Sequence, residues 1–331
     1  MQLQHVEHGR RLAIVNEPFL SIIEPYETCY DIALAAIAQG KRLTQLLQEG
    51  VSSVQMDYDL IYQGDSDWRL LPAFDHPYDP LHCMLSGTGL THKASAENRQ
   101  KMHMAQQSSV ETDSMKMYRW GEEGGKVPPG QIGVQPEWFY KGNGTSLRAH
   151  GAALSVPNYA DDGGEEPEVA GVYIIDERGR PWRIGFCTAN EFSDHQMEKK
   201  NYLYLAPSKI RNCAIGPELV IDIDFDDIIG KVGIIRETES MWRRTIKTGE
   251  KNMAHSLSNL EYHHFKYANH RQPGQVHIHF FGADAFSFGE GWVLQDGDMM
   301  EVQWEGLGRP LKNYLVVDEG EEHMVSVQTM R

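Results

Sequence analysis

Apolar positions in the first third of the chain recur with the spacing of a helix. Between Thr28 and Gly50, apolar residues return at intervals of three and four, which is the pattern of a helix that packs one face inward. Thr28 is a suitable N-cap with Asp31 in the first turn, Gly40 is placed to interrupt the helix, and Gly50 is a natural stop. A second stretch over about 95–117, rich in Ala, Met, Gln and Lys, also predicts helix.

Beyond residue 121 the pattern changes to an alternation with a period of two. The stretch 121–133 is rich in Gly, Pro and Glu, the composition of an exposed loop or a hinge. One further helix is expected around 256–267, and the other periodic segments predict strands: VAGVYIIDE, PWRIGFCTA, ELVIDIDF, KVGIIRE, QVHIHFFG and DMMEVQWEG. The sequence therefore predicts an α+β fold, with a smaller, helical α/β domain over 1–120 and a β-rich domain over 121–331.

Composition narrows the class of protein. The 331 residues carry a net charge of −16, which argues against a nucleic-acid partner because phosphate contacts depend on clustered Lys and Arg. An acidic balance still permits an anionic substrate where a metal ion and a few lysines dominate the local field. No apolar run has the length of a signal peptide or of a membrane span. Four scattered cysteines without a CxxC pair are typical of reduced thiols in a cytoplasmic protein.

Two glutamates directly before a predicted strand are the strongest local chemical signal. Glu166 and Glu168 flank Pro167, and in extended chain residues i and i+2 point to one side, so both carboxylates can bind one cation. Oxygen ligands of this kind favour Mg²⁺, Mn²⁺ or Ca²⁺ over Zn²⁺. Taken alone, such a pair on a surface strand is more often simply solvated.

A second acidic cluster and a lysine follow in the next segments. The cluster contains Glu191, Asp194 and His195, and Lys209 lies in the loop APSKIRNCAIGPELV. A lone lysine in a loop is usually solvated. Beside a metal-bound enolate it would instead act as an acid, a base or an electrostatic clamp.

Taken together, these motifs resemble the fumarylacetoacetate hydrolase family over roughly residues 81–317. The family pattern is a Glu-x-Glu, an Asn-Asp-x-Ser segment ending in Gln, a Lys before a Gly-Pro turn, and a Gly-x-Gly-x-Leu-x-Asn end. This chain has the corresponding elements in the same order: Glu166-Pro167-Glu168, Asn190-Glu191-Phe192-Ser193, Gln196, Lys209, Gly216-Pro217 and LQDGDMMEVQWEGLGRPLKN. The resemblance implies a β-rich catalytic domain built as a mixed β-sandwich or roll. It also implies the site residues, which are Glu166, Glu168 and Glu191 as metal ligands, Lys209 as a catalytic group and Gln196 as a substrate contact.

Departures from the family pattern point to one of its branches. Glu191 stands where the family usually has Asp, the segment FFGADAF lacks the family's Thr, and the Ser-to-Gln segment is two residues shorter and lacks the Arg of the hydrolases. That shortened segment, with WFYKGNGTSLRAHG and IRETESMWRRTIKTGEKNMAHSLSNLEYHHF, is similar to the AraD1-type enzymes that dehydrate 2-keto-3-deoxy sugar acids. This similarity implies a Mg²⁺-dependent conversion of a 2-keto-3-deoxypentonate to 2,5-dioxopentanoate through a metal-stabilised enolate, with Mn²⁺ as a possible substitute. It also implies a homodimer or a larger homo-oligomer.

Four further residues are candidates for the site. The family carries a His-Glu pair on a short lid helix, and His92 and Glu97 in GTGLTHKASAENR stand near those positions. Their alternative is a polar residue at a helix start and a solvated helix face. Thr145 and Ser146 in KGNGTS are placed to offer hydroxyls and backbone N–H groups to a substrate carboxylate. A plain turn explains that segment equally well.

Two alternative functions follow from the same residues. A hydrolase of acylpyruvates or 2,4-diketo acids would use the same metal and cleave a C–C bond. A non-catalytic, cupin-like binding module would instead hold a transition metal on His277 and His279, which face one way on a strand. The cupin pattern expects a Glu a few residues later, and this chain offers Asp284 at best. The pair is therefore expected to pack against the sheet.

Overall fold

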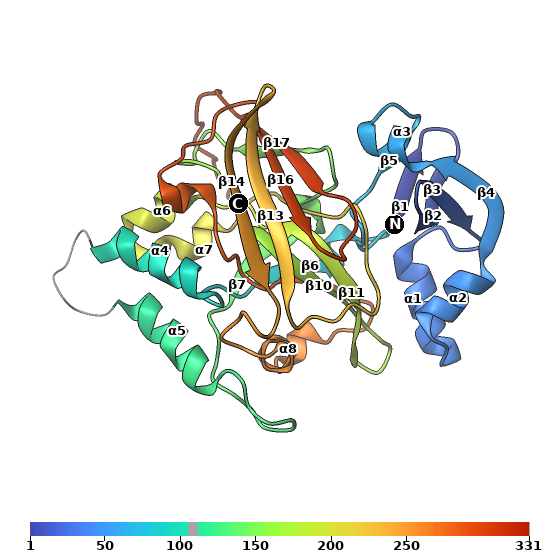
Figure 1. The fold of residues 1–331 in the computed structure, drawn as a ribbon, viewed down its shortest axis with the longest axis horizontal. Helices are drawn as coiled ribbons and strands as arrows, with labels where there is room; N and C mark the ends of the chain where they lie inside the picture. The colour runs from blue at the N-terminus through green and yellow to red at the C-terminus, as the bar shows by residue number, and fades with distance from the viewer. Residues whose placement is uncertain (105–111, 331) are drawn as a thin grey trace.

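The computed structural model describes residues 1–104 and 112–330, and side chains are described outside 101–111 (Figure 1). Its N-terminal part is an antiparallel sheet with three helices, at the right of Figure 1. The strand order is β4-β3-β2-β1-β5, and the elements are β1 (Gln2–His5), β2 (Gly9–Asn16), β3 (Phe19–Ile23), α1 (Cys29–Gln39), α2 (Leu43–Glu49), β4 (Val51–Asp57), α3 (Tyr58–Gln63) and β5 (Trp68–Leu70).

The capping residues predicted for the first helical stretch are confirmed. The Thr28 side chain accepts a hydrogen bond from the Asp31 N–H at the start of α1, and Gly40 ends that helix in the left-handed conformation with φ 62°. Gly50 follows the last residue of α2. The stretch expected as one helix over about 95–117 contains parts of two helices, α4 (Lys93–Met104) and α5 (Asp113–Gly124), and its middle, 105–111, lies outside the described residues.

A seven-stranded mixed sheet forms the centre of the molecule. Its strand order is β7-β6-β15-β10-β11-β12-β8. The 3₁₀ helix η2 (Gly144–Ser146) joins β7 to β8, which stand at opposite ends of that order, so the sheet curls back on itself. The strands are β6 (Cys83–Gly87), β7 (Phe139–Asn143), β8 (Leu147–Arg148), β10 (Pro167–Ile175), β11 (Pro181–Asn190), β12 (Cys213–Ile215) and β15 (Val276–Phe280).

A third sheet and several short helices complete the structure. The sheet has the order β14-β13-β16-β17-β9, and helices α4 to α7 lie together at the left of Figure 1. The remaining elements are η1 (Pro80–His82), β9 (Ala153–Val156), α6 (His195–Lys200), η3 (Tyr202–Tyr204), α7 (Leu205–Ser208), β13 (Ile228–Arg236), β14 (Glu239–Thr248), α8 (Leu257–Phe265), η4 (Ala268–His270), η5 (Ser287–Glu290), β16 (Met299–Trp304) and β17 (Leu311–Val317). This mixture of sheets and helices fits the predicted α+β class.

Both faces of the central sheet are covered, which explains why every residue of β10 is buried. Alternate residues of β10 point to opposite faces. Val169 and Tyr173 pack into a core shared with the third sheet, whereas Ala170 and Val172 pack into a second core that includes residues of α1. Glu168 has the same parity as Ala170 and therefore stands at one end of this second core.

Several segments differ from the sequence predictions. Beyond residue 121 one helix was expected, around 256–267, but α6 and α7 also lie there, and α5 continues to Gly124 into the predicted loop over 121–133. The segment 218–225, expected as a strand, pairs with the sheet only through an isolated bridge from Val220 to Phe186, and Asp222 has a φ of 61° that extended strand does not allow. Strand β6 falls in the range assigned to the N-terminal domain, yet it belongs to the central sheet. We therefore propose that the division between the two parts lies near 71–82, between β5 and β6, instead of at 120.

No helix in the described part of the chain is both long enough and apolar enough to cross a membrane.

Candidate metal centre

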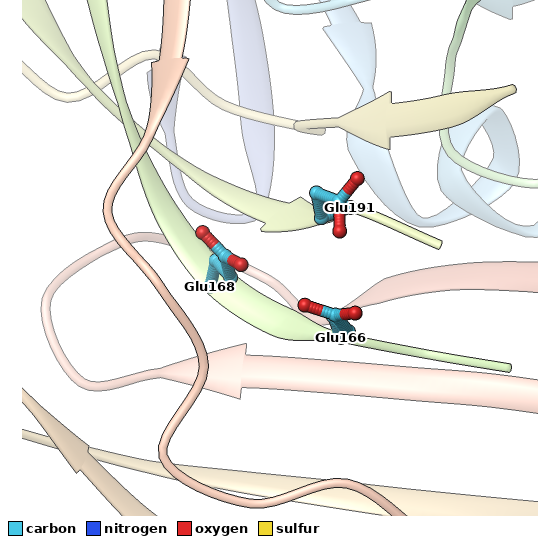
Figure 2. Close-up of side chains that lie close together, drawn as sticks. All are labelled: Glu166, Glu168 and Glu191. Atoms are coloured by element: carbon cyan, nitrogen blue, oxygen red, sulfur yellow. The ribbon is translucent and has the colours of Figure 1, made fainter. Parts of the chain in front are cut away.

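Strand pairing brings three glutamates together at one end of the central sheet. Glu166 and Glu168 flank the first residue of β10, and Glu191 directly follows β11. These strands pair antiparallel with Pro167 opposite Asn190, and the Glu191 N–H donates to the Glu166 carbonyl at 3.0 Å. One carboxylate oxygen from each glutamate lies within 4.8 Å of the others. Figure 2 shows the three carboxylates turned toward one region from two strands.

Burial makes this concentration of negative charge costly. All three side chains are buried, and the pKa of Glu168 is well above its usual range because of burial and the neighbouring charges of Glu166 and Glu191. The Gly282 N–H, which donates to Glu168 Oε2 at 2.6 Å, offsets part of that increase. Burial also raises the pKa of Glu166, but Lys209 and His195 outweigh it and hold that pKa well below its usual value.

Lys209 occupies the centre of this cluster. It follows the short helix α7 and is 1% exposed. Its Nζ lies 2.5 Å from Glu166 Oε1, 2.8 Å from Glu191 Oε2 and 2.9 Å from Ser193 Oγ. Burial lowers the pKa of this ammonium, but the surrounding carboxylates of Glu166, Glu191 and Glu198 outweigh it and hold the pKa well above its usual value. Lys209 is therefore a cation in this arrangement.

The donor set fits a hard divalent cation. Three buried carboxyl groups lie beside two buried lysines, Lys209 and Lys141. Burial and the anionic neighbours raise the pKa of Glu168, so a divalent cation bound here would displace its proton and relieve the repulsion. The donors are oxygen atoms. Mg²⁺ and Mn²⁺ select oxygen ligands and tolerate few protein ligands, because water and substrate fill the other coordination positions.

His92 and Glu97 lie in different environments: His92 is buried and Glu97 is exposed. The His92 ring is buried, its Nδ1 lies 2.9 Å from Thr91 Oγ1, and its Nε2 has no hydrogen-bond partner among the described residues. Thr91 also donates to the Phe281 carbonyl, next to the Gly282 N–H that binds Glu168. Glu97 on α4 is exposed and lies 3.9 Å from Lys93, so Thr91, not Glu97, hydrogen-bonds the His92 ring. The role predicted for Glu97 stays a prediction, and its position favours the solvated alternative.

The predicted substrate contacts have local partners. The Gln196 N–H donates to Asp162 Oδ1 at 3.1 Å, in the first turn of α6. Thr145 is exposed in η2, and its N–H and hydroxyl both donate to Asn143 Oδ1. These bonds account for KGNGTS as a turn. Substrate binding by Gln196, Thr145 and Ser146 stays a prediction.

Sequence reasoning missed buried groups that contact the glutamates. Lys141 on β7 is fully buried, with Nζ 2.8 Å from Glu191 Oε1, and a lysine inside an otherwise apolar strand is the signal that marks it. His195 was noted without a role; its Nε2 lies 3.2 Å from Glu166 Oε1, and its ring stacks on Phe286 with centroids 4.7 Å apart. Glu198 lies 3.2 Å from Lys209, and no local sequence pattern distinguishes it.

The histidine pair on β15 is engaged in hydrogen bonds. His279 Nδ1 and Nε2 lie 2.9 and 2.8 Å from the hydroxyls of Ser86 and Thr88, and His277 Nδ1 lies 2.9 Å from His264 Nε2. Among the residues that the structure describes, the three glutamates are the one group placed to hold a metal. The two rings thus contact β6, the loop that follows it and α8. That they help to shape the pocket stays a prediction, and the cupin-like alternative has no metal-binding group of this kind among the described residues.

Replacing His279 with Gln is expected to make the fold less sensitive to acid. Burial lowers the pKa of His279 to about 3, against about 6.5 in an unfolded chain. Because the folded pKa is the lower one, the native state loses stability as the pH falls below about 6.5, by roughly 2 kcal/mol at pH 5. Urea unfolding at about pH 6.5 and at about pH 5 should show that the variant loses less free energy of unfolding between these two pH values than the parent does.

The matched control is His82→Gln, because the His82 side chain is 56% exposed. Its acid-induced loss of stability should equal that of the parent. If His279→Gln also matches the parent, His279 is not held neutral by the fold.

Comparisons with known proteins bear on the fold and the family of this chain. No protein-family model matches the sequence. A curated relative, a probable 2-keto-3-deoxyxylonate dehydratase of Haloferax volcanii, is 26% identical over 179 residues, which cover 53% of this chain and 58% of that protein. The alignment thus spans little more than half the length of that relative.

Solved structures extend the likeness over nearly the whole chain. The structure of 2-keto-3-deoxy-D-arabinonate dehydratase complexed with magnesium and 2,5-dioxopentanoate has a TM-score of 0.69 at 19% identity and covers 97% of this chain and 100% of its own. A 5-carboxymethyl-2-hydroxymuconate delta-isomerase from Mycobacterium smegmatis has a TM-score of 0.57 at 15% identity, with 96% and 98% covered. The sequence similarity and the shared fold confirm that this chain resembles the AraD1-like, 2-keto-3-deoxypentonate dehydratase branch of the fumarylacetoacetate hydrolase superfamily.

Proposed function

We propose that the protein is a Mg²⁺-dependent dehydratase that converts a 2-keto-3-deoxypentonate to 2,5-dioxopentanoate. The observation that carries this proposal is the buried cluster of Glu166, Glu168 and Glu191 with the Lys209 ammonium among them. The relatives named as dehydratases of such sugar acids, one of them complexed with magnesium and 2,5-dioxopentanoate, support it.

The three glutamates would hold the ion, with Mn²⁺ as a substitute. When bound, the ion supplies a Lewis acid that stabilises negative charge on the 2-keto oxygen as a proton leaves C3. The protein's task is then to move protons: one leaves C3 and one joins the hydroxyl that leaves C4 as water. One proton then leaves C5 and one returns to C3, which gives an enol, and the aldehyde forms when C4 gains a proton and the C5 hydroxyl loses one.

Lys209 is the proposed acid and electrostatic clamp. Its ammonium is buried and surrounded by carboxylates, so it carries a proton at neutral pH and can donate it to a leaving oxygen. Ser193 holds this geometry, because its Oγ accepts from Lys209 at 2.9 Å and donates to Glu191 Oε2 at 2.7 Å. A fixed cation in a site closed to water is a strong electrostatic element.

His92 is the proposed base. The single hydroxyl proton of Thr91 goes to the Phe281 carbonyl at 2.6 Å, so Thr91 Oγ1 accepts from His92 Nδ1–H. The lone pair therefore lies on Nε2, which is buried without a hydrogen-bond partner among the described residues. Burial lowers the pKa of His92 to about 3, so the ring is neutral at pH 7 and the Nε2 lone pair is free.

The setting of the reaction is also a proposal. We propose a homodimer or larger homo-oligomer that works in the cytoplasm, with the small sugar acid as its partner and without a membrane or nucleic-acid partner. The four cysteines Cys29, Cys83, Cys187 and Cys213 are buried and free, which supports a reducing compartment.

The purified protein, given a 2-keto-3-deoxypentonate and Mg²⁺, is expected to release 2,5-dioxopentanoate. A coupled aldehyde dehydrogenase detects that product. In heavy water the C3 protons should exchange for deuterium before product accumulates, because C3 deprotonation comes first. Consumption of acylpyruvates alone would replace the dehydratase proposal with the hydrolase. Release of pyruvate together with glycolaldehyde would show retro-aldol cleavage of the C3–C4 bond and would also contradict the dehydratase proposal.

A further inference from the structure

A chain of buried ion pairs begins on helix α4 and ends at Glu166 and Glu191, two of the three glutamates. Arg99 of α4 lies between two carboxylates: its Nη1 is 3.0 Å from both oxygens of Glu137, and its Nη2 is 3.3 Å from Glu198 Oε2. The three side chains are 9%, 5% and 8% exposed. The Tyr202 hydroxyl donates to Glu137 at 2.7 Å and completes this end of the chain.

Glu198 of α6 joins two cations through its two oxygens. Oε2 faces Arg99, whereas Oε1 lies 3.2 Å from Lys209 Nζ and accepts the Ser208 hydroxyl at 3.1 Å. Lys209 in turn contacts Glu166 and Glu191. One carboxylate therefore connects α4, which directly follows His92, with the ammonium that lies among the proposed metal ligands.

We propose that Glu198 is a positioning residue that couples the place of the Lys209 ammonium to helix α4 through Arg99. A buried carboxylate shared by two cations compensates both, so its neutralisation leaves each cation with fewer partners where water cannot replace them. The coupling links His92, the proposed base directly before α4, to Lys209, the proposed acid, through Arg99 and Glu198. Its effect on turnover rests on the proposed function, whereas the coupling itself does not.

Hydrogen exchange read by mass spectrometry tests the coupling without any activity. In Glu198→Gln, amides of both 93–104 and 205–211 should exchange about 10-fold faster or more, because both segments lose an ionic anchor. Glu137→Gln is the matched control, since Glu137 binds Arg99 and not Lys209. It should accelerate 93–104, and it should accelerate 205–211 less than Glu198→Gln does, because the Glu198–Lys209 ion pair remains in place. Unchanged exchange of 205–211 in Glu198→Gln, or equal acceleration in the control, overturns the proposal.

Lys209→Met tests the same link from the other end. Coupling is reciprocal, so removal of the ammonium should accelerate exchange in 93–104, to which Lys209 is linked through Glu198 and Arg99. This variant keeps the proposal testable even where Glu198→Gln does not fold, and unchanged exchange in 93–104 contradicts it.

Kinetics provide the second readout. Glu198→Gln should lower kcat by about 10-fold or more with KM and Mg²⁺ affinity within about 3-fold of the parent, because the acid is misplaced while the ligands remain. Glu198→Asp, which keeps the charge, should recover part of kcat. If the parent enzyme itself lacks dehydratase turnover, the proposed function fails and the exchange results still decide the coupling. A kcat unchanged in Glu198→Gln, with the parent active, rejects the positioning role.

Discussion

Replacing Lys209 with Met is expected to reduce turnover by about 10³-fold, in the range that a positioned acid and a fixed charge contribute. Methionine keeps the volume of the stem and removes the ammonium that lies 2.5 Å from Glu166 and 2.8 Å from Glu191. Because that ammonium competes with a cation for the same carboxylates, Mg²⁺ affinity measured by calorimetry should not weaken. The loss should appear in kcat.

The control for this change is Lys199→Met. Lys199 is an exposed residue of α6, so its replacement should leave turnover within about 2-fold of the parent, as for most surface changes. Turnover of Lys209→Met within tenfold of the parent would show that Lys209 balances charge and takes no part in the chemistry.

Replacing Glu168 with Gln is expected to weaken Mg²⁺ binding by about 100-fold or more, since loss even of an outer-shell partner costs about 10–100-fold. Glutamine keeps the oxygen that accepts the Gly282 N–H but cannot ionise, so it removes the negative charge that Glu168 would give to a bound ion. Chelation with EDTA should abolish the activity of the parent, Mg²⁺ or Mn²⁺ should restore it, and the variant should stay inactive at the same metal concentration.

Glu165→Gln provides the matched control. Glu165 is equally buried and only one residue from the ligands, but both its oxygens accept from Ser287 instead. Its Mg²⁺ affinity should stay within about 3-fold of the parent, because the charge lost lies outside the ligand set. Equal affinity in the Glu168 variant and this control would mean that Glu168 is not a ligand.

The glutamate cluster was predictable because its geometry is local. Spacing of i and i+2 before a strand places Glu166 and Glu168 on one side, and the family resemblance added Glu191 and Lys209. The resemblance also implies the α+β fold. The N-terminal sheet was harder to predict, because β4 is largely exposed and lacks a two-residue apolar alternation.

The supporting contacts were not predictable because they depend on register and on distant segments. Lys141 meets Glu191 only because the sheet curls back on itself. Arg99 and Glu198 are far apart in sequence and meet through helix packing. His92 takes its partner from the adjacent Thr91, although the family pattern indicated Glu97. Such pairs carry no periodic signal in a single sequence.

The binding positions of a metal ion and a 2-keto acid decide the proposed function. Crystals soaked with Mn²⁺ and pyruvate would locate the ion by its anomalous scattering. We expect one peak coordinated by Glu166, Glu168 and Glu191, with pyruvate bound to it through its carboxylate and keto oxygens and the Lys209 ammonium beside it. A peak at His277 and His279, or pyruvate bound away from the three glutamates, would contradict the proposed function.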